Sequence, residues 1–353
     1  MWYYKKGGVL MLSIKRINKD KILNQSSNYN GIDLIKFMCS ILVFAIHIPP
    51  LQNEAFELAK YFNFGLQNYL CRIAVPFYFV ASGFFLFRKM DFYNLKPDII
   101  KNYCFNILKI MCIWRVLLNT GDITHHLWYL GSSVVAIALV SICFYKQIKI
   151  SWICVLSCVL YIAGLFGDSY YGIIEPVISN GLLEIFTNVF GFFMGSTRNG
   201  IFMGFVFVLI GAIFSQYRIE VKPLKSAIGF VLSMLGLLVE VFLLSHFDIP
   251  KDYNMYLFLI PASIFLFLFA KNLKLKDSSI YKRLRVIGFI IYLTHLLVNK
   301  IVVWFMGYID KCLDVNLFAY KFFISLLLSI LIAVLVECLS RKNKFKWIRI
   351  FIS

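Results

Sequence analysis

Long apolar runs separated by short polar segments recur along most of the 353-residue chain. A helix rises about 1.5 Å per residue, so runs of roughly 20 residues match the hydrocarbon core of a bilayer. The runs predict an all-α, polytopic membrane protein with about ten transmembrane helices. The approximate spans are 33–51, 72–88, 100–118, 126–145, 151–167, 200–216, 225–246, 254–271, 285–307 and 317–339.

The remaining segments suggest how the chain is organised. We expect a cytoplasmic tail at 1–30, which could include an interfacial amphipathic helix, a transmembrane domain at 31–340 and a basic cytoplasmic tail at 341–353. Residues 167–200 form a long polar loop, which is either functional or an ordinary connection. Its apolar part, 182–195, is re-entrant, interfacial or an eleventh span.

The distribution of charge orients the predicted spans. The chain is 60% hydrophobic and 15% charged, with a net charge of +18. With the N-terminus inside, 26 of the 36 Lys and Arg residues fall in inside segments and five fall in outside loops. This bias follows the positive-inside rule and places both termini in the cytoplasm. Because the basic residues alternate with apolar spans rather than forming a stripe, we reject nucleic-acid binding.

Several common kinds of site are not indicated. The nine cysteines are scattered, mostly within predicted spans, so neither a disulfide framework nor a zinc site is expected. We expect no metal. The chain lacks a Gly-rich phosphate loop, HExxH and Gly-x-Ser-x-Gly, so a covalent serine mechanism has no support.

The first predicted span carries three ionisable residues, Asp33, Lys36 and His47. Lys36 and His47 are about 16 Å apart along a helix and lie on nearly the same face. A neutral His47 toward the outer leaflet would suit a general base for a hydroxyl, and Lys36 at the cytoplasmic mouth would suit an anionic ligand. Asp33, three residues before Lys36, could pair with it and hold it. The ordinary alternative is that these residues mark the membrane boundary.

Other spans carry further candidates. Arg72 stands at the outer end of the second span, where Ser82 and Gly83 are small enough for close helix contact. Glu240 and Lys300 lie within spans and could form an ion pair. The last candidates are at the start of the fourth span, before the sixth and within the ninth: His125, His126, Trp128, Arg198, Asn199, Tyr292 and His295. Packing, membrane anchoring or a solvated loop end would also explain them.

These motifs together resemble the acyltransferase 3 family of integral membrane proteins. The family's first span typically carries an Asp, an Arg three residues later and then a His, and Asp33, Lys36 and His47 stand at the matching places. Lys36 is a departure, because Lys keeps the charge but lacks the guanidinium fork. The other matching segments are Val75-Pro-Phe-Tyr-Phe-Val-Ala-Ser-Gly-Phe84, His126-Leu-Trp-Tyr-Leu130 and Tyr292-Leu-Thr-His295.

The segment Thr197-Arg-Asn-Gly-Ile-Phe-Met-Gly-Phe205 additionally resembles one branch of this family. That branch includes the membrane domain of the serine racemase of vancomycin resistance, where the membrane part is linked to handling serine.

The resemblance implies a multi-pass protein of the inner or plasma membrane that moves acetyl from cytoplasmic acetyl-CoA (acyl-CoA) to a cell-surface polysaccharide or glycolipid hydroxyl. It implies catalytic roles for His47, Lys36 and Asp33. Binding of acyl-CoA or acceptor would involve Arg72, Ser82, His126, Trp128, Arg198, Asn199, Tyr292 and His295. The alternatives are a non-catalytic transporter or binder of a small amino acid such as serine, and a scaffold of a surface-polymer pathway. The oligomeric state, including a homo-oligomer, stays open.

Overall fold

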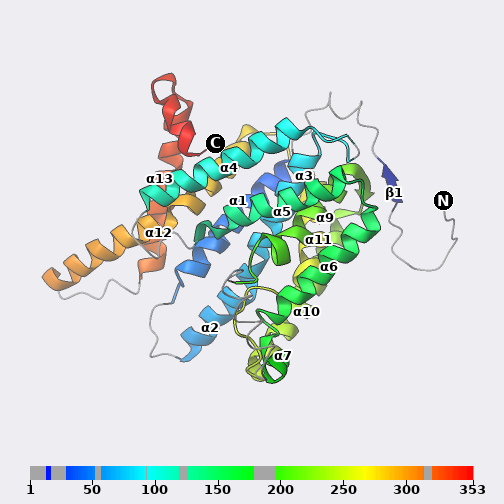
Figure 1. Ribbon diagram of the computed structural model, residues 1–353. Coiled ribbons are helices and arrows are strands. Elements are labelled where there is room, and N and C mark those ends of the chain that lie inside the picture. Colours follow the sequence, from blue (N-terminus) through cyan, green and yellow to red (C-terminus); the bar gives the residue numbers. More distant parts are fainter. Residues whose placement is uncertain are drawn as a thin grey trace.

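The computed structural model describes residues 13–16, 29–51, 57–92, 94–118, 126–178, 196–313 and 320–352. Its regular structure is helical apart from one short pair of strands (Figure 1). The first half contains α1 (Asn30–His47), α2 (Glu57–Asn68), η2 (Leu70–Ile73), α3 (Ala74–Phe87), α4 (Pro97–Leu117), α5 (Trp128–Tyr145), α6 (Ile150–Phe166) and α7 (Tyr171–Ile178). The second half contains η4 (Gly200–Gly204), α9 (Phe205–Gln216), α10 (Pro223–His246), α11 (Leu259–Asn272), α12 (Ser279–Leu313), α13 (Lys321–Arg341) and η6 (Asn343–Phe351).

The helices confirm the predicted helical class. Among the described residues, six helical segments are long and apolar enough to cross a membrane: Asn30–His47, Glu57–Phe87, Trp128–Tyr145, Pro223–His246, Ser279–Ile309 and Lys321–Arg341. Three shorter apolar helices are Ile150–Phe166, Gly200–Gln216 and Leu259–Asn272. All of these, together with α4, overlap predicted spans. The count of ten spans and the side on which the termini lie stay predictions.

The closest packing in the bundle is between α3 and α9. A Cβ atom added at Gly83 would collide with the carbonyl oxygen of Val208, and one added at Gly211 would collide with that of Val80. Only glycine lets the two backbones approach this closely. The predicted close helix contact at Gly83 is therefore confirmed, and it holds α3 against α9.

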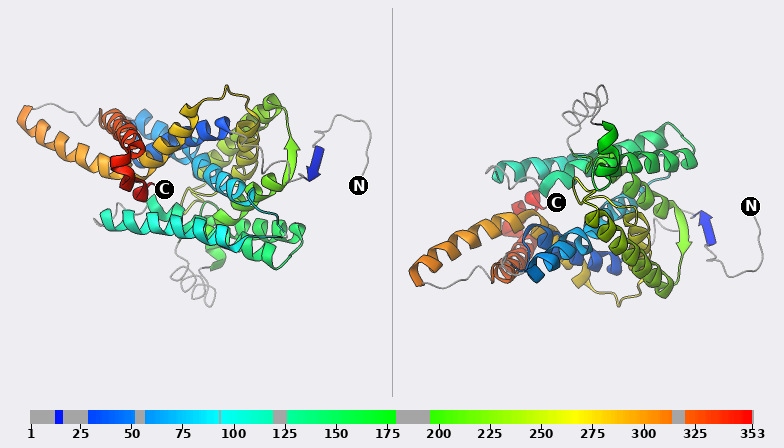
Figure 2. Two further views of the ribbon diagram at one scale, coloured as in Figure 1. Left: turned by 90° about the horizontal axis from the view of Figure 1, so that it is seen from above. Right: turned by 90° about the horizontal axis from the view of Figure 1, so that it is seen from below.

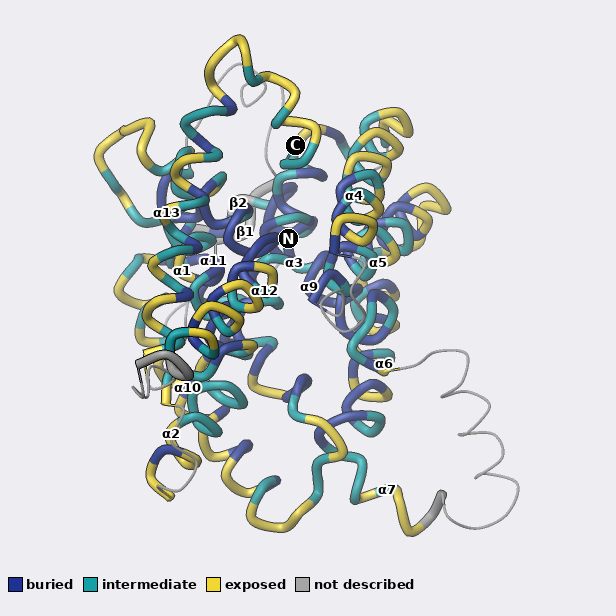
Figure 3. The backbone as a smooth tube through the Cα atoms, turned by 90° about the vertical axis from the view of Figure 1, so that its left-hand side faces the viewer, coloured by how far each residue is buried: buried dark blue, intermediate teal, exposed yellow. Residues whose placement is uncertain are grey.

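Burial is concentrated in the central helices, while the outer helices carry many exposed residues (Figure 3). Many of these exposed residues are apolar. Along α10 the exposed residues include Leu224, Val231, Leu238 and Phe242, and α13 exposes a similar row. Broad apolar faces of this kind are stable against lipid and costly against water. They support placement of these helices at the membrane boundary.

A short antiparallel pair joins the N-terminal segment to the bundle. Strand β1 (Ser13–Arg16) pairs with β2 (Tyr217–Glu220), with Ser13 opposite Glu220. For the four described residues of β1, the suggested amphipathic helix is therefore wrong. The rest of the 1–28 segment lies outside the described residues, as do His125 and the apolar stretch 182–195.

Glu240 of α10 anchors the start of α11. Its carboxylate accepts hydrogen bonds from the backbone N–H groups of Leu257 and Phe258, at 2.7 and 3.0 Å, and from the Tyr170 hydroxyl at 2.7 Å. A carboxylate at a helix N-terminus satisfies backbone donors that lack partners within the helix. The suggested ion pair with Lys300 is therefore wrong.

The end of the described chain lies beside α4 (Figure 2). The indole Nε1–H of Trp114 donates to the carbonyl oxygen of Phe351 in η6, at 2.9 Å. Residues 343–352 thus fold back onto the bundle, and Ile352 reaches a cavity within it. The described part of the predicted basic tail therefore contacts the helices at these points, while most of its residues are exposed.

Candidate functional site

Three histidines from distant parts of the chain meet in the bundle. His47 ends α1, His126 lies two residues before α5, and His295 lies in the middle of α12. The ring centroid of His295 is 5.2 Å from that of His47 and 5.0 Å from that of His126, and the His47 and His126 centroids are 6.3 Å apart. His126 and His295 are buried, whereas His47 is exposed. His47 is therefore the imidazole of this cluster that a ligand can reach.

The hydrogen bonds of His295 define which ring nitrogen carries the proton. Its Nδ1 lies 2.9 Å from the carbonyl oxygen of Tyr292 and 3.1 Å from that of Ile291. Both partners only accept, so Nδ1 must donate and the neutral ring keeps its lone pair on Nε2. That Nε2 is buried and has no hydrogen-bond partner among the described residues. His295 can therefore accept a hydrogen bond inside the cluster.

Tyr292 ties α12 to the segment that precedes α5. Its hydroxyl donates to the backbone carbonyl oxygen of His126 at 2.8 Å, and its ring centroid is 5.6 Å from that of His126. Because Tyr292 and His295 are three residues apart on one helix, they face the same side of α12. One turn of α12 thus positions two of the three histidines.

A small cavity of about 40 Å³, which we call the His47 cavity, lies beside the cluster. At about 10–15 Å³ for each water-sized probe, this volume has room for roughly three such groups. The polar or aromatic residues that line it are His47, Arg72, His126, Trp128, Tyr129, Arg198, Asn254 and Tyr292.

Two arginines in this cavity share one neutral acceptor. Arg72 Nη1 donates to Asn254 Oδ1 at 2.7 Å, and Arg198 Nη1 donates to the same oxygen at 2.8 Å. Arg72 Nη2 also donates to Asn68 Oδ1 at 2.7 Å, and the Arg198 guanidinium lies 4.8 Å from the centroid of the Trp128 ring. These contacts hold both guanidinium groups in place without neutralising either charge.

Asp168 fixes the orientation of Asn254 from behind the arginines. Its Oδ1 accepts from the backbone N–H groups of Asn254 and Met255, at 2.7 and 3.0 Å, and its Oδ2 accepts from Asn254 Nδ2 at 3.0 Å. Burial raises the pKa of the Asp168 carboxyl above its usual value, while these donors oppose the rise. Since Asn254 gives its amide N–H to Asp168, its oxygen must face the arginines.

A second cavity of about 410 Å³, which we call the Lys36 cavity, lies further along the same helices. Its size falls in the range typical of small-molecule sites. The polar residues that line it are Lys36, Tyr78, Ser82, Tyr103, Asn106, Tyr129, Ser133, Arg285 and Tyr292, and Ile352 of the folded-back segment also lines it.

The two cavities share part of their walls. Val43 of α1, Val75 of α3, Tyr129 of α5 and Tyr292 of α12 line both of them. Val43 lies between Lys36 and His47 on α1, so the helical face predicted from the sequence passes from one cavity to the other. The surroundings of Lys36 and of His47 are therefore bounded by the same four side chains.

The predicted pairing of Asp33 with Lys36 is wrong. Asp33 instead forms an ion pair with Arg285 of α12, whose Nη1 lies 3.2 Å from Asp33 Oδ1. The Lys36 ammonium group lies 4.7 Å from the centroid of the Phe85 ring. The tertiary contact replaces the local pair because α1 and α12 pack side by side, which brings a guanidinium to the carboxylate.

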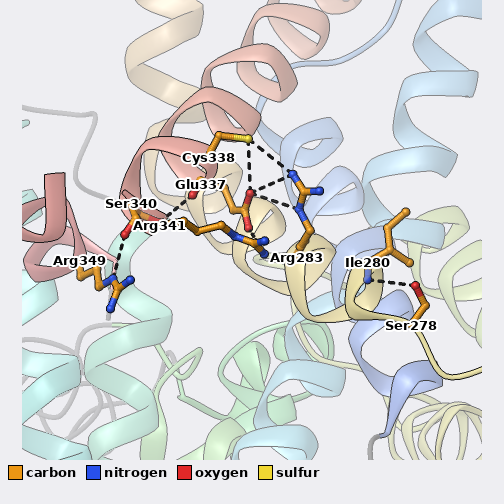
Figure 4. Close-up of polar contacts among 8 residues, drawn as sticks. All are labelled: Ser278, Ile280, Arg283, Glu337, Cys338, Ser340, Arg341 and Arg349. Atoms are coloured by element: carbon orange, nitrogen blue, oxygen red, sulfur yellow. Dashed lines mark hydrogen bonds and ion pairs between the residues drawn. The ribbon is translucent and has the colours of Figure 1, made fainter. Parts of the chain in front are cut away.

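Near this end of the bundle, a further acid pairs with arginines (Figure 4). Glu337 of α13, whose exposed fraction is 2%, accepts from Arg283 Nη2 at 3.3 Å and forms an ion pair with Arg341. Arg349 donates from Nε to the backbone oxygen of Ser340 at 2.9 Å. These contacts tie α12, α13 and η6 together.

The structure divides the predicted site residues between the two cavities. The His47 cavity brings together His47, Arg72, His126, Trp128, Arg198 and Tyr292, with His295 packed behind. Lys36, Ser82 and again Tyr292 line the Lys36 cavity, where Ser82 Oγ lies 3.1 Å from the Tyr129 hydroxyl. Asn199 caps η4 instead, because its Oδ1 accepts from the N–H groups of Ile201 and Phe202. This capping accounts for Asn199 without a ligand.

Sequence reasoning missed three residues that build these cavities. Asn254 and Asp168 orient the arginines, and Arg285 takes the place expected for Lys36 beside Asp33. The only local signals were an amide at the edge of an apolar run and an acid within a polar loop. Neither signal indicates a partner 86 residues away.

The fold and site define the class of the protein: a helical membrane protein whose histidine cluster and lysine lie on either side of a shared wall. Residues 29–120 match the family described as the acyltransferase domain. This segment contains Asp33, Lys36, His47, Arg72 and Ser82. The resemblance to the acyltransferase 3 family is therefore confirmed.

Three curated relatives fit the suggested branch. The chain is 29% identical to a serine/alanine racemase of Enterococcus gallinarum over 90% of its own length and 47% of the relative's length. It is 30% identical to an amino-acid racemase of Enterococcus faecalis over 68% of its own length and 35% of the relative's length. A second amino-acid racemase of that species is 29% identical over 77% of this chain and 41% of the relative. The chain thus spans between about a third and a half of these relatives, and no solved structure matches it.

Proposed function

We propose that the protein is a membrane O-acyltransferase that moves an acyl group from cytoplasmic acyl-CoA to a hydroxyl of an extracytoplasmic cell-surface glycan or glycolipid. Acetyl from acetyl-CoA is the donor that we would test first. The observation that carries this proposal is the wall shared by the Lys36 and His47 cavities. It would let a thioester reach the histidine cluster while its polar part stays on the cytoplasmic side. The acyltransferase-domain match supports the same class of reaction.

The Lys36 cavity suits the donor. Its lining combines apolar side chains with hydroxyl and amide groups, which would suit the methylene and amide parts of a pantetheine arm, and Lys36 and Arg285 supply positive charge for phosphate groups. The predicted topology places these residues toward the cytoplasm, where Lys and Arg are abundant. In this proposal Lys36 holds a donor phosphate or orients the arm, and Asp33 keeps Arg285 in position.

His47 is the proposed general base. A neutral imidazole would accept the acceptor's hydroxyl proton as the oxygen attacks the thioester carbonyl carbon. The carbon–sulfur bond then breaks, and the imidazolium of His47 returns the proton to the departing thiolate. The product is an ester and a free thiol, so atoms and charge balance. His126 and His295 lie against the His47 ring and position it.

Purified protein incubated with labelled acetyl-CoA would test this assignment. We expect wild-type protein to transfer the label to a surface-glycan acceptor, or to hydrolyse acetyl-CoA when acceptor is absent. His47→Ala should lose either activity, while His246→Ala should keep it, because His246 lies at the end of α10 against Phe242. Full transfer by His47→Ala would overturn the role of His47.

The second candidate is a non-catalytic transporter or binder of a small amino acid such as serine. The relatives named serine/alanine racemase and amino-acid racemase favour it, since one of them aligns with 90% of this chain. Uptake of labelled serine into vesicles that contain the protein, with no turnover of acetyl-CoA, would support this function against the first.

A further inference from the structure

The His47 cavity carries an excess of positive charge. Arg72 and Arg198 line it, and among the described residues of its lining there is no Asp or Glu. Within the described part of the chain, neither guanidinium has a carboxylate at ion-pair distance. Two half-buried cations that share one small cavity repel each other, and an anion between them relieves this cost.

The protein holds both guanidinium groups with neutral amides. Asn254 Oδ1 accepts from both arginines, and Asn68 Oδ1 accepts a further hydrogen bond from Arg72. Arg72 Nε is buried and has no hydrogen-bond partner among the described residues. Donors therefore remain for a ligand. The charges of Asp168 and Asp252 act on Arg72 from a distance, but within the described part of the chain neither acid forms an ion pair with it, and the Asp168 carboxylate accepts from Asn254 and Met255.

We propose that the His47 cavity binds a carboxylate group of its ligand, held by Arg72 and Arg198 beside His47. The volume of about 40 Å³ suits a group of three heavy atoms, with the rest of the ligand outside it. Guanidinium groups bind carboxylates through short charge-assisted hydrogen bonds. The binding of a carboxylate does not depend on the proposed function, whereas the statement that this ligand is the acyl acceptor rests on it. The acceptor would then be an acidic sugar or an amino acid rather than a neutral sugar.

Isosteric pairs of probes would separate charge from shape. We would measure binding to detergent-purified full-length protein by calorimetry, using D-glucuronate against D-glucuronamide and L-serine against L-serinamide. The carboxylate of at least one pair should bind about tenfold or more tightly than its amide, because hydrogen bonds to charged groups contribute about 1.5–3 kcal/mol. The pair that responds distinguishes a sugar acid from an amino acid.

Three variants would link that preference to the arginines. Arg198→Gln should lower the carboxylate preference about tenfold, and Asn68→Asp should lower it too, because it gives Arg72 a carboxylate partner of nearly the same shape. Arg88→Gln is the matched control. Its guanidinium lies 4.7 Å from the Tyr29 ring, much as Arg198 lies over Trp128, but Arg88 does not line the His47 cavity.

The outcomes separate this inference from the proposed function. Equal binding of each carboxylate and its amide, or stronger binding of inorganic phosphate than of either carboxylate, would overturn the inference. Arg198→Gln that keeps the full preference would overturn it as well, whether or not acetyl is transferred. Carboxylate binding without acetyl transfer would uphold the inference and contradict the acyltransferase function instead.

Discussion

Arginines serve two different purposes at the two cavities. Beside the Lys36 cavity, Arg285 pairs with Asp33, and the nearby Arg283 and Arg341 pair with Glu337 (Figure 4). At the His47 cavity, Arg72 and Arg198 are held by amide oxygens. In the first region each of these arginines forms an ion pair with an acid of the protein, whereas in the second, among the described residues, neither arginine has a carboxylate at ion-pair distance.

This difference separates structural charges from binding charges. A buried carboxylate that already has arginine partners ties helices together, and removing it leaves cations without a counter-charge. A guanidinium held by a neutral amide is positioned but can still take an anionic ligand. We therefore expect changes at the two sets of arginines to affect different properties.

The largest expected effect is on acyl transfer. His47→Ala should lower the transfer rate by about 100-fold or more, because a general base typically contributes about 10²–10⁴-fold. Labelled acetyl released or transferred per minute is the measurement. The transfer rate of His246→Ala should stay within about twofold of the wild-type rate, because this substitution leaves the acid and base groups at both cavities unchanged. Equal losses in both variants would point to general damage rather than to His47.

A smaller effect is expected at Arg72. Arg72→Gln should weaken acceptor binding by about ten- to a hundredfold, since it removes one charge and two hydrogen bonds that position it. The KM for the acceptor should rise more than kcat falls, while the KM for the acyl donor should hardly change. A rise in the donor KM alone would contradict the assignment of the donor to the Lys36 cavity and of the acceptor to the His47 cavity.

Asp168 tests the support behind the arginines. Asp168→Asn would place an amide N–H group against Asn254 Nδ2, unless the Asn254 side chain turns and presents that donor to Arg72 and Arg198. We expect acceptor affinity to fall about tenfold with intact helical structure by circular dichroism. Asp252→Asn is the control for the loss of a nearby negative charge, because within the described part of the chain the Asp252 side chain accepts from the neighbouring backbone N–H of Tyr253 and makes no hydrogen bond to Asn254. Unchanged affinity in Asp168→Asn would show that Asn254 is oriented by something else.

The smallest effect on acceptor binding is expected at Arg283. Arg283→Gln should change acceptor affinity by less than about twofold while lowering the thermal midpoint of the purified protein, because Glu337 loses one of its partners. Thermal unfolding and acceptor titration on the same preparation would measure both quantities. A large loss of acceptor affinity with an unchanged thermal midpoint would show that the arginines paired with acids also serve acceptor binding, which contradicts the difference between the two sets.

The sequence predicted the helices well because hydrophobic length and helical period are local properties. The same period placed Lys36 and His47 on one face of α1, and the structure puts Val43 between them on the wall shared by the cavities. Gly83 was identified as a close-contact position for the same local reason, since a small residue in an apolar run has few other uses.

The partners of the charged residues could not be predicted in this way. Asp33 was assigned to Lys36 by helical spacing, but its partner Arg285 is 252 residues away and is brought close by the packing of α1 on α12. The meeting of His47, His126 and His295 likewise depends on three distant segments whose relative positions no local pattern specifies.

Transfer across the membrane tests the central claim most directly. Protein would be placed in sealed proteoliposomes with labelled acetyl-CoA on the side of Lys36 and an acceptor bearing a carboxylate and a hydroxyl enclosed on the side of His47. We predict that label accumulates on the enclosed acceptor with wild-type protein and not with His47→Ala. Label that reaches acceptor only when both substrates are on the same side would contradict a route through the shared wall of the two cavities.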